Sequence, residues 1–192
     1  MLLQKGEVIR LKELSLNILD VAENSVRAGA TLVEISLTQE NGTLTITIQD
    51  DGCGMSREIL EQVENPFYTT RTTRSVGLGI PLYKMAAEQT GGTVTIRSVE
   101  KADDSEHHGT TVTALFYTDH IDCAPLGDIV STVCTLIHGS PQIDFVFTHK
   151  TSEREVSLDT RELRAVLGDE ISLDNFEVMR WIRESLEEQY QS

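Results

Sequence analysis

The sequence has few cysteines and no long apolar run. Its three cysteines, Cys53, Cys123 and Cys134, are widely spaced and form no Cys-x-x-Cys pair. This pattern argues against a disulfide framework or a zinc site, and it favours a reducing, cytoplasmic location. No run of 18 apolar residues is present, and the first ten residues lack the apolar core and cleavage site of a signal peptide. We therefore expect neither export nor membrane insertion.

Basic residues are also scarce. The chain has 16 Lys and Arg against 31 Asp and Glu, which gives a net charge of -15. Such a surface repels nucleic-acid phosphates and anionic membranes, and the densest basic run, Arg71 and Arg74, is short. We expect no nucleic-acid partner and no membrane partner. With 192 residues, 39% of them hydrophobic, the chain can form one domain or a domain with a smaller appendage.

An acidic, glycine-rich corner ends one of the predicted strands. Alternating apolar residues predict strands over 31–38 and 43–49, and the second strand leads into Asp50, Gly52 and Gly54. A carboxylate only accepts hydrogen bonds, and glycine leaves the backbone beside it unobstructed. The corner therefore suits the recognition of a base. Taken alone, it is more typical of a solvated surface turn.

An amphipathic helix is predicted over residues 10–28. Its polar side carries Asp20, Asn24 and Arg27 at positions i, i+4 and i+7. Most stripes of this kind are solvated faces, and the alternative is a ligand-binding face. The spacing by itself does not separate the two interpretations.

The rest of the chain alternates between short periodic segments and Gly-rich or polar breaks. The further predicted elements are a helix over 56–64, a helix that runs from a glycine box (residues 75–80) to residue 89, strands over 93–98 and 111–117, a helix over 125–138, a hairpin of 142–148 with 155–158, and a helix over 174–189. His107 and His108 lie in a polar loop with no third metal ligand at suitable spacing, so we expect them to be exposed. We expect Cys53 to be a small buried packing residue.

Four stretches in this order resemble the ATP site of the GHKL family, which comprises gyrase, heat-shock chaperone, histidine kinase and MutL ATPases. They are Asp20 to Ala30, Asp50 to Met55, Asn65 to Ile80, and Gly109-Thr110-Thr111. The resemblance is strongest to the histidine kinase type and covers roughly residues 10 to 117. It implies an α+β chain with a two-layer α/β sandwich, the Bergerat ATP-binding fold, over residues 1–118. Residues 119–192 carry no recognised motif, and we expect them to form a small α+β subdomain of unassigned role.

The resemblance implies ATP and Mg²⁺ as cofactors. Asp50 would accept the adenine N6 amino group, with the hydroxyl of Thr110 beside it, and Gly52 and Gly54 would let the chain pass close to the base. A guanine O6 at this place would set two acceptors against each other, so adenine is favoured. Asn24 would be the metal ligand, giving a neutral oxygen to Mg²⁺.

The phosphate side of the site is also implied by the resemblance. A helix N-terminus with free backbone N–H groups attracts phosphate, and the glycine box precedes such a helix. Val76 departs from the usual Thr of this box, which predicts reduced affinity. Phe67 would anchor a lid over the phosphates. The residues implied in nucleotide binding on this side are Arg27, Phe67, Arg71, Gly77, Leu78 and Gly79.

Asp20 is the implied catalytic residue, and it departs from the hydrolytic relatives, which carry Glu there. The shorter side chain lowers its reach as a water base, so hydrolysis is disfavoured. We predict a cytoplasmic ATP-binding protein that is a histidine or serine kinase in signalling, acting on a partner protein in trans, because no His precedes His107. The alternative is a non-catalytic ATP-binding regulatory module of a larger assembly. A homodimer is left open.

Overall fold

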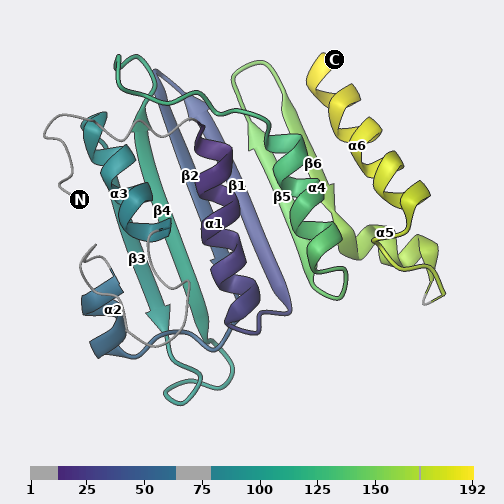
Figure 1. Ribbon diagram of the computed structural model, residues 1–192, viewed down its shortest axis with the longest axis horizontal. Helices are drawn as coiled ribbons and strands as arrows, with labels where there is room; N and C mark the ends of the chain where they lie inside the picture. Colours follow the sequence, from purple (N-terminus) through teal and green to yellow (C-terminus); the bar gives the residue numbers. More distant parts are fainter. Residues whose placement is uncertain (1–12, 64–78, 169) are drawn as a thin grey trace, which may run out of the picture.

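The computed structural model describes residues 13–63, 79–168 and 170–192, which form a sheet with helices layered on it (Figure 1). Within these ranges the strands make one six-stranded sheet of order β3-β4-β2-β1-β5-β6. The strands are β1 (Leu32–Glu40), β2 (Thr43–Asp50), β3 (Thr93–Val99), β4 (Gly109–Tyr117), β5 (Asp144–Lys150) and β6 (Glu155–Asp159). The helices are α1 (Leu14–Arg27), α2 (Arg57–Val63), α3 (Gly79–Gln89), α4 (Ile129–Gly139), α5 (Thr160–Leu167) and α6 (Phe176–Gln191).

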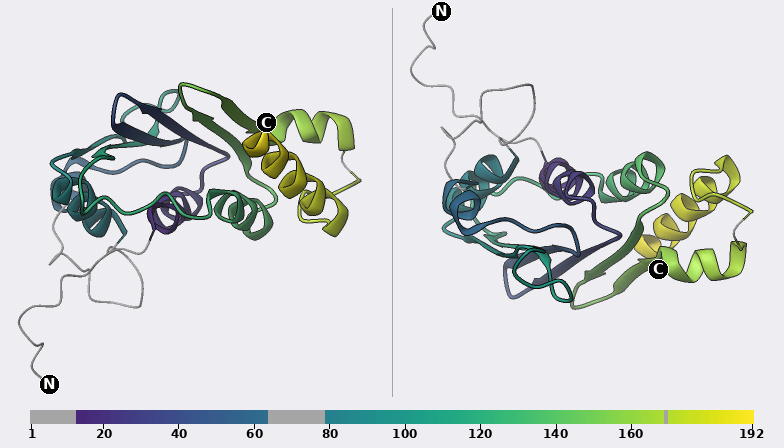
Figure 2. Two further views of the ribbon diagram at one scale, coloured as in Figure 1. Left: turned by 90° about the horizontal axis from the view of Figure 1, so that it is seen from above. Right: turned by 90° about the horizontal axis from the view of Figure 1, so that it is seen from below.

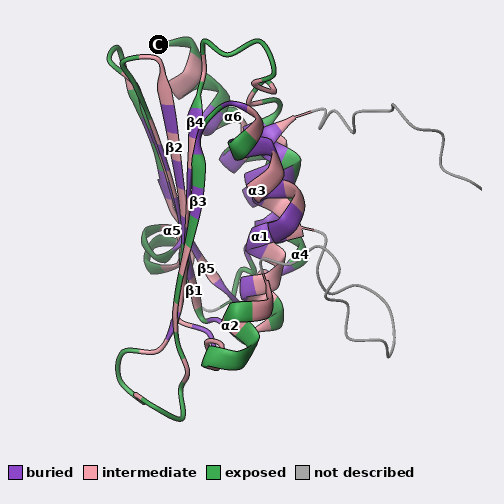
Figure 3. Ribbon diagram, turned by 90° about the vertical axis from the view of Figure 1, so that its left-hand side faces the viewer, coloured by how far each residue is buried: buried purple, intermediate pink, exposed green. Residues whose placement is uncertain are grey.

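Helices α1, α3 and α4 lie side by side against one face of the sheet (Figures 1 and 2). Figure 3 shows this helix layer edge-on. The core between the layers is built from the alternating strand residues and the apolar side of each helix. Its largest fully buried side chains, each contributing about 1.5 to 3 kcal/mol, include Leu14, Ile18, Ile35, Leu37, Ile46, Ile48, Tyr83 and Phe116. The predicted α+β fold with a two-layer sandwich is confirmed.

The opposite face of the central strands is polar. Its side chains are not buried, and many are threonines, including Thr38, Thr45, Thr47, Thr95 and Thr113. Such a face is normal in antiparallel pairing, where one side can meet water while the other side packs on the core. The strict alternation along β1 and β2 therefore sets which face receives the helices.

Residues 119–192 extend the same sheet. Strand β5 pairs in parallel with β1, with Val33 opposite Phe145, and β6 pairs antiparallel with β5. The predicted hairpin is therefore present, and it adds two strands to one edge. The proposed domain boundary after residue 118 falls between β4 and α4, and the strands on its two sides hydrogen-bond to each other. Whether the two parts fold as separate units stays a prediction.

Helix α5 was not predicted from the sequence. It begins after Asp159, whose carboxylate accepts a hydrogen bond from the Arg161 backbone N–H at 2.9 Å, and it ends at Gly168, whose φ is 72°. Both are ordinary helix-boundary signals. The helix is short, and its apolar residues Leu163, Val166 and Leu167 give the helical spacing i, i+3, i+4 only once, which is too brief a pattern to predict a helix alone.

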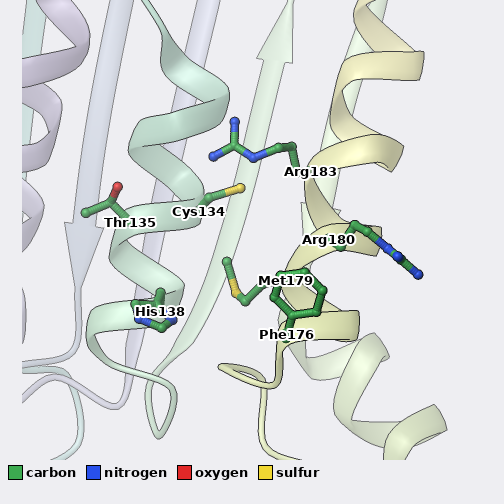
Figure 4. A pocket seen from close by; sticks show the side chains of 7 residues that line it. All are labelled: Cys134, Thr135, His138, Phe176, Met179, Arg180 and Arg183. Carbon is green, nitrogen blue, oxygen red and sulfur yellow. The ribbon is translucent and has the colours of Figure 1, made fainter.

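Helix α6 lies at the end of the molecule opposite α2 and α3 (Figure 1) and packs on α4 and β6. A hollow of about 440 Å³ separates it from part of α4. Figure 4 shows Arg183 reaching from α6 toward α4, where its guanidinium donates to Ser131 Oγ at 3.2 Å. Among the helices that the structure describes, none is both long and apolar enough to cross a membrane.

Candidate functional site

A cavity of about 290 Å³ lies where the C-terminal half of α1 meets the sheet and α2. Its polar lining includes Asn24, Arg27, Asp50 and Thr110. Its remaining walls are largely apolar, formed by Val21, Met55, Ile59, Val63, Ile80 and Val112. A cavity with apolar walls and a few convergent polar groups is the usual form of a small-molecule site.

The carboxylate of Asp50 is held in a fixed orientation. Its Oδ1 accepts from the backbone N–H of Gly52 at 2.9 Å and from that of Thr110 at 3.3 Å. Its Oδ2 accepts from Ser25 Oγ at 2.6 Å. An ionised carboxylate offers about four acceptor positions, so these three bonds leave one for a donor in the cavity. Antiparallel pairing of β2 with β4 brings Asp50 opposite Thr110, although the two are far apart in sequence.

Ser25 belongs to the cavity lining and was missed by sequence reasoning. It lies among the buried residues of α1, with 4% of its surface exposed. A buried hydroxyl needs a hydrogen-bond partner, and Asp50 is that partner. A polar residue in an otherwise apolar helix face was therefore the available signal that this helix meets a polar group of the sheet.

Asp51, the next residue, has a different task. It accepts from the backbone N–H groups of Thr31 at 2.7 Å and Leu32 at 2.9 Å, and from Thr31 Oγ1. Partial burial acts to raise the pKa of Asp51, but the hydrogen bonds from Thr31 and Leu32 outweigh it and hold that pKa below its ordinary value. Asp51 ties the acidic corner to the start of β1. The two neighbouring carboxylates thus divide into one that faces the cavity and one that fixes the loop.

Glycine is required at two places in this corner. Gly54 has φ of 68°, and a Cβ there would lie 1.9 Å from the carbonyl oxygen of Val99. Gly52 is buried, and a Cβ there would lie 2.9 Å from Ala28 Cβ at the end of α1. Gly54 lines the cavity, whereas Gly52 brings the loop against the helix end. Both contacts let the acidic corner sit close to its neighbours.

Thr110 takes part in a small polar network beside Asp50. Its hydroxyl lies 2.9 Å from Ser98 Oγ, and Ser98 Oγ in turn accepts from the Met55 backbone N–H at 2.8 Å. His108 Nδ1 lies 2.6 Å from the carbonyl oxygen of Gly52. The expectation that both loop histidines are exposed is therefore wrong for His108, which is half-buried, whereas the side chain of His107 is 81% exposed. Ser98 and His108 thus hold the acidic corner through its backbone, at Met55 and Gly52 respectively.

The polar side of α1 faces the start of α3. A Cβ on Gly79 would lie 3.2 Å from Asp20 Cβ and 3.9 Å from Asn24 Nδ2, so this glycine lets the two helices approach. The pKa of Asp20 is raised above its ordinary value, first because burial penalises the charged form and then because Glu23 is close. Arg27 opposes this shift and donates to Asn24 Oδ1 at 3.2 Å and to Glu23 Oε2 at 2.5 Å.

The structure brings together most of the predicted site residues that it describes. Asn24, Arg27, Asp50, Gly54 and Thr110 all line the cavity. Asp20, Gly52 and Gly79 are not in its lining and contact or approach residues that are. Four predicted residues lie outside the described ranges, namely Phe67, Arg71, Gly77 and Leu78.

Cys53 corrects one expectation. We expected a buried packing residue, and its side chain is exposed. Gly52 on one side and Gly54 on the other meet close neighbours, while Cys53 is held through its backbone, whose N–H donates to Ala28 O at 2.9 Å and whose carbonyl oxygen accepts from the Lys101 N–H at 2.9 Å. Within the described ranges, no three His, Cys, Asp or Glu side chains lie together in a group that could hold a metal ion.

Comparison with known proteins gives results consistent with this geometry. A family model described as "Histidine kinase-, DNA gyrase B-, and HSP90-like ATPase" matches residues 6–120. Sensor histidine kinase CpxA of Escherichia coli (strain K12) is 34% identical over 91 residues, covering 45% of this chain and 19% of the relative. Sporulation kinase B of Bacillus subtilis (strain 168) is 30% identical over 112 residues, covering 58% of this chain and 24% of the relative. The chain thus spans about a fifth to a quarter of the length of these relatives.

A solved structure shares the overall fold over more of the chain. The N-terminal domain of a DNA repair protein aligns with a TM-score of 0.56 at 14% identity, covering 83% of this chain and 58% of that one. The alignment extends beyond the 115 or so residues of the family match, so it includes part of the region after β4. At this identity the likeness concerns the fold alone.

Proposed function

The chain belongs to the family of histidine kinase-, DNA gyrase B- and HSP90-like ATPases, and from this premise we propose that its cavity binds ATP with Mg²⁺. We further propose that the protein is a cytoplasmic signalling kinase that phosphorylates a partner protein in trans. The observation that carries the nucleotide assignment is the Asp50 carboxylate, which has one acceptor position left and faces an apolar cavity. The N6 amino group of adenine is a donor that fits this position.

The walls of the cavity suit a purine. A flat ring gains contact area from apolar side chains around it, and the cavity lining includes Met55, which precedes α2, and Ile80 of α3. Thr110 lies beside Asp50 and offers a hydroxyl to the edge of the base. These groups support adenine binding because the one charged acceptor lies among apolar neighbours, where a mismatched acceptor such as guanine O6 costs the most.

Asn24 fits the proposed role of magnesium ligand. Its amide oxygen lies in the cavity wall and is neutral, which suits an ion that takes its negative ligands from phosphates. The oxygen now accepts from Arg27, whose side chain is 51% exposed. Turning of Arg27 toward phosphate would free the oxygen for the ion. When bound, Mg²⁺ neutralises charge on the phosphates.

The remaining proposed roles concern the phosphates. Arg27 supplies a positive charge at the cavity wall, and α3 begins at Gly79 beside Asp20. The backbone N–H groups at the start of this 11-residue helix favour an anion. We assign Gly77 and Leu78, which precede it in the sequence, to the same part of the site. Phe67 and Arg71 keep their proposed role in the segment that covers the phosphates.

Transfer to a protein is favoured over hydrolysis by the identity of residue 20. A raised pKa makes the Asp20 carboxylate a better proton acceptor when ionised, but Asp is about one methylene shorter than the Glu expected in a hydrolytic site. Phosphoryl transfer needs positioning and charge neutralisation more than a water base. The second candidate function, a regulatory module that binds ATP without turnover, is favoured by the same Asp20 and by Val76 in the glycine box.

Incubation with γ-labelled ATP and Mg²⁺ distinguishes these functions. A kinase is expected to transfer label to a partner protein or to itself, a regulatory module to bind ATP and release no label, and a hydrolytic ATPase to release free phosphate. The assay is run with and without candidate partners, and Asp50→Asn serves as the control for contaminating kinases. Release of labelled free phosphate as fast as the wild-type protein consumes ATP, with no label on any protein, would contradict the kinase proposal.

Asn24→Ala is expected to remove most of the Mg²⁺ dependence of ATP binding while leaving part of the binding itself. The physical reason is that the variant loses the neutral oxygen that we assign to the ion, whereas Ala maintains the helix. Calorimetric titration of ATP in Mg²⁺ and in EDTA measures the difference. The matched control is Leu16→Ala on the same helix, at a position that is 50% exposed and not in the cavity lining. Intact Mg²⁺ dependence in Asn24→Ala would exclude Asn24 as the ligand.

A further inference from the structure

An apolar groove lies between α5 and α6, far from the nucleotide cavity and at the opposite end of the molecule from α2 (Figure 1). Its volume is about 530 Å³, and its walls are formed by Leu163, Val166, Leu167, Ile171, Val178 and Trp181. Val166 is 86% exposed and Trp181 is 52% exposed. Exposed apolar side chains that gather along one groove, rather than being scattered singly, mark an interaction surface.

The rim of this groove is acidic. Glu177 is the charged residue of its lining, and three more exposed carboxylates, Glu162, Glu170 and Asp174, each stand next to a lining residue in the sequence. The cations of the two helices nearest to these residues in the sequence are already paired: Arg180 pairs with Glu177 and Glu184, Arg161 with Asp159, and Arg164 with Asp144. The whole chain has a net charge of -15, so the electrostatic potential from the rest of the protein is also negative on average and attracts a basic partner.

We propose that the α5–α6 groove binds an amphipathic helix of a partner protein that carries Lys or Arg beside its apolar face. An apolar groove between two helices accepts a third helix through apolar residues at i, i+3, i+4 and i+7. The acidic rim then meets the basic residues that flank this face. A second copy of this chain is disfavoured as the occupant, because a twofold contact would bring the same acidic rim against itself.

The hollow on the other side of α6 differs in charge. It is lined by His138, Arg180 and Arg183, with Cys134 and Met179 between them (Figure 4). Figure 4 shows Arg183 directed toward α4 and Arg180 directed away from it. The charged residues that line the hollow beside α4 are thus basic, whereas the charged residue that lines the α5–α6 groove is Glu177. Of these two hollows, the α5–α6 groove is the one that combines widely exposed apolar walls with acidic neighbours, and this combination favours a basic helix.

The proposed groove does not depend on ATP binding. None of its lining residues lines the nucleotide cavity, and α5 and α6 contribute nothing to that cavity. A failure of the nucleotide assignment would therefore leave the groove proposal standing, and a failure of the groove would leave the nucleotide assignment standing.

Trp181 provides the measurement, because it is the only tryptophan in the chain and lies in the groove. The probe is a synthetic amphipathic helical peptide of Leu and Lys, titrated into the full chain. We expect a saturable blue shift of the tryptophan emission, with binding at least about tenfold tighter than for a scrambled peptide of the same composition. A Leu and Glu peptide with the same pattern is expected to bind weakly or not at all.

Val166→Asp is expected to weaken binding of the Leu and Lys peptide at least about tenfold, by placing a charge in the apolar wall. The matched control is Ile121→Asp, at a position that is 90% exposed and outside the groove. Both variants add the same negative charge, so non-specific attraction of a basic peptide would rise equally in both. We expect the affinity of Ile121→Asp to stay within about twofold of wild type. Ile171→Asp is a second variant in the groove wall and is expected to behave as Val166→Asp.

Three results would overturn the proposal. The first is equal binding of the patterned and scrambled peptides, and the second is equal affinity of the Val166→Asp and Ile121→Asp variants. The third is a concentration-dependent dimer in sedimentation velocity that Val166→Asp abolishes, since the occupant would then be a second copy of this chain.

Discussion

Replacing Asp50 by Asn is expected to weaken ATP binding by about 1 to 3 kcal/mol, roughly 5- to 140-fold, while the fold is retained. The affected contact is the one acceptor position of the carboxylate that its three intramolecular hydrogen bonds leave free. In the variant an NH₂ group takes the place of one carboxylate oxygen. The adenine amino group then meets a donor, and a charge-assisted hydrogen bond is lost.

The fold is expected to survive this change because each intramolecular bond of Asp50 has a substitute. The amide oxygen can take the place of Oδ1 and accept from the backbone N–H groups of Gly52 and Thr110. The NH₂ group then takes the place of Oδ2, and the hydroxyl of Ser25 can turn to accept from it. The loss therefore falls on the ligand. This separation makes Asp50→Asn a sharper test than Asp50→Ala, which would leave Ser25 and two backbone donors without an acceptor.

Calorimetric titration with ATP measures the effect, and Asp51→Asn is the matched control. Asp51 accepts from Thr31 and Leu32 and is not in the cavity lining, so its variant is expected to lower the free energy of unfolding and to leave ATP affinity within about twofold. Unchanged ATP affinity in Asp50→Asn would refute the adenine assignment. We also expect the wild-type protein to bind ATP more tightly than GTP, and we expect the ratio of the two affinities to be smaller in Asp50→Asn.

The parts of the candidate site that could be predicted are those whose functional side chains lie close together in the sequence. Asp50, Gly52 and Gly54 follow one another within a single turn, and Asn24 and Arg27 share one side of a helix. Each group is visible within a short window of sequence. Their meeting around one cavity depends on β2 pairing with β4 and on α1 packing over the sheet, which the family resemblance implied and the alternation of the strands supports.

The features that were missed depend on contacts between distant parts of the chain. The bond from Ser25 to Asp50 joins a helix face to a strand end, and the identity of either residue alone does not reveal it. The parallel pairing of β1 with β5 joins strands that are separated by most of the chain, and local periodicity carries no information about such partners. The α5–α6 groove was missed for the same reason, because the apolar residues of α5 form a groove only where they lie beside α6.

Gly54→Ala is expected to destabilise the protein by about 2 to 5 kcal/mol and to abolish measurable ATP binding. Two costs add at this position. An L-residue at φ of 68° is strained by about 1 to 2 kcal/mol, and its Cβ would lie 1.9 Å from the carbonyl oxygen of Val99, which is backbone and cannot swing away. Relief of this contact requires the acidic corner to move from the end of β3, and Asp50 would move with it.

Gly29→Ala separates the two costs. Gly29 has nearly the same backbone conformation, with φ of 72°, but a Cβ there would meet nothing within 4 Å. Its variant is therefore expected to lose only the conformational part, about 1 to 2 kcal/mol, and to bind ATP with an affinity close to that of the wild type. Urea unfolding of both variants, with ATP titration in parallel, measures the difference. Equal losses of stability in the two variants would mean that the contact with Val99 does not fix the position of the acidic corner, and would contradict this explanation.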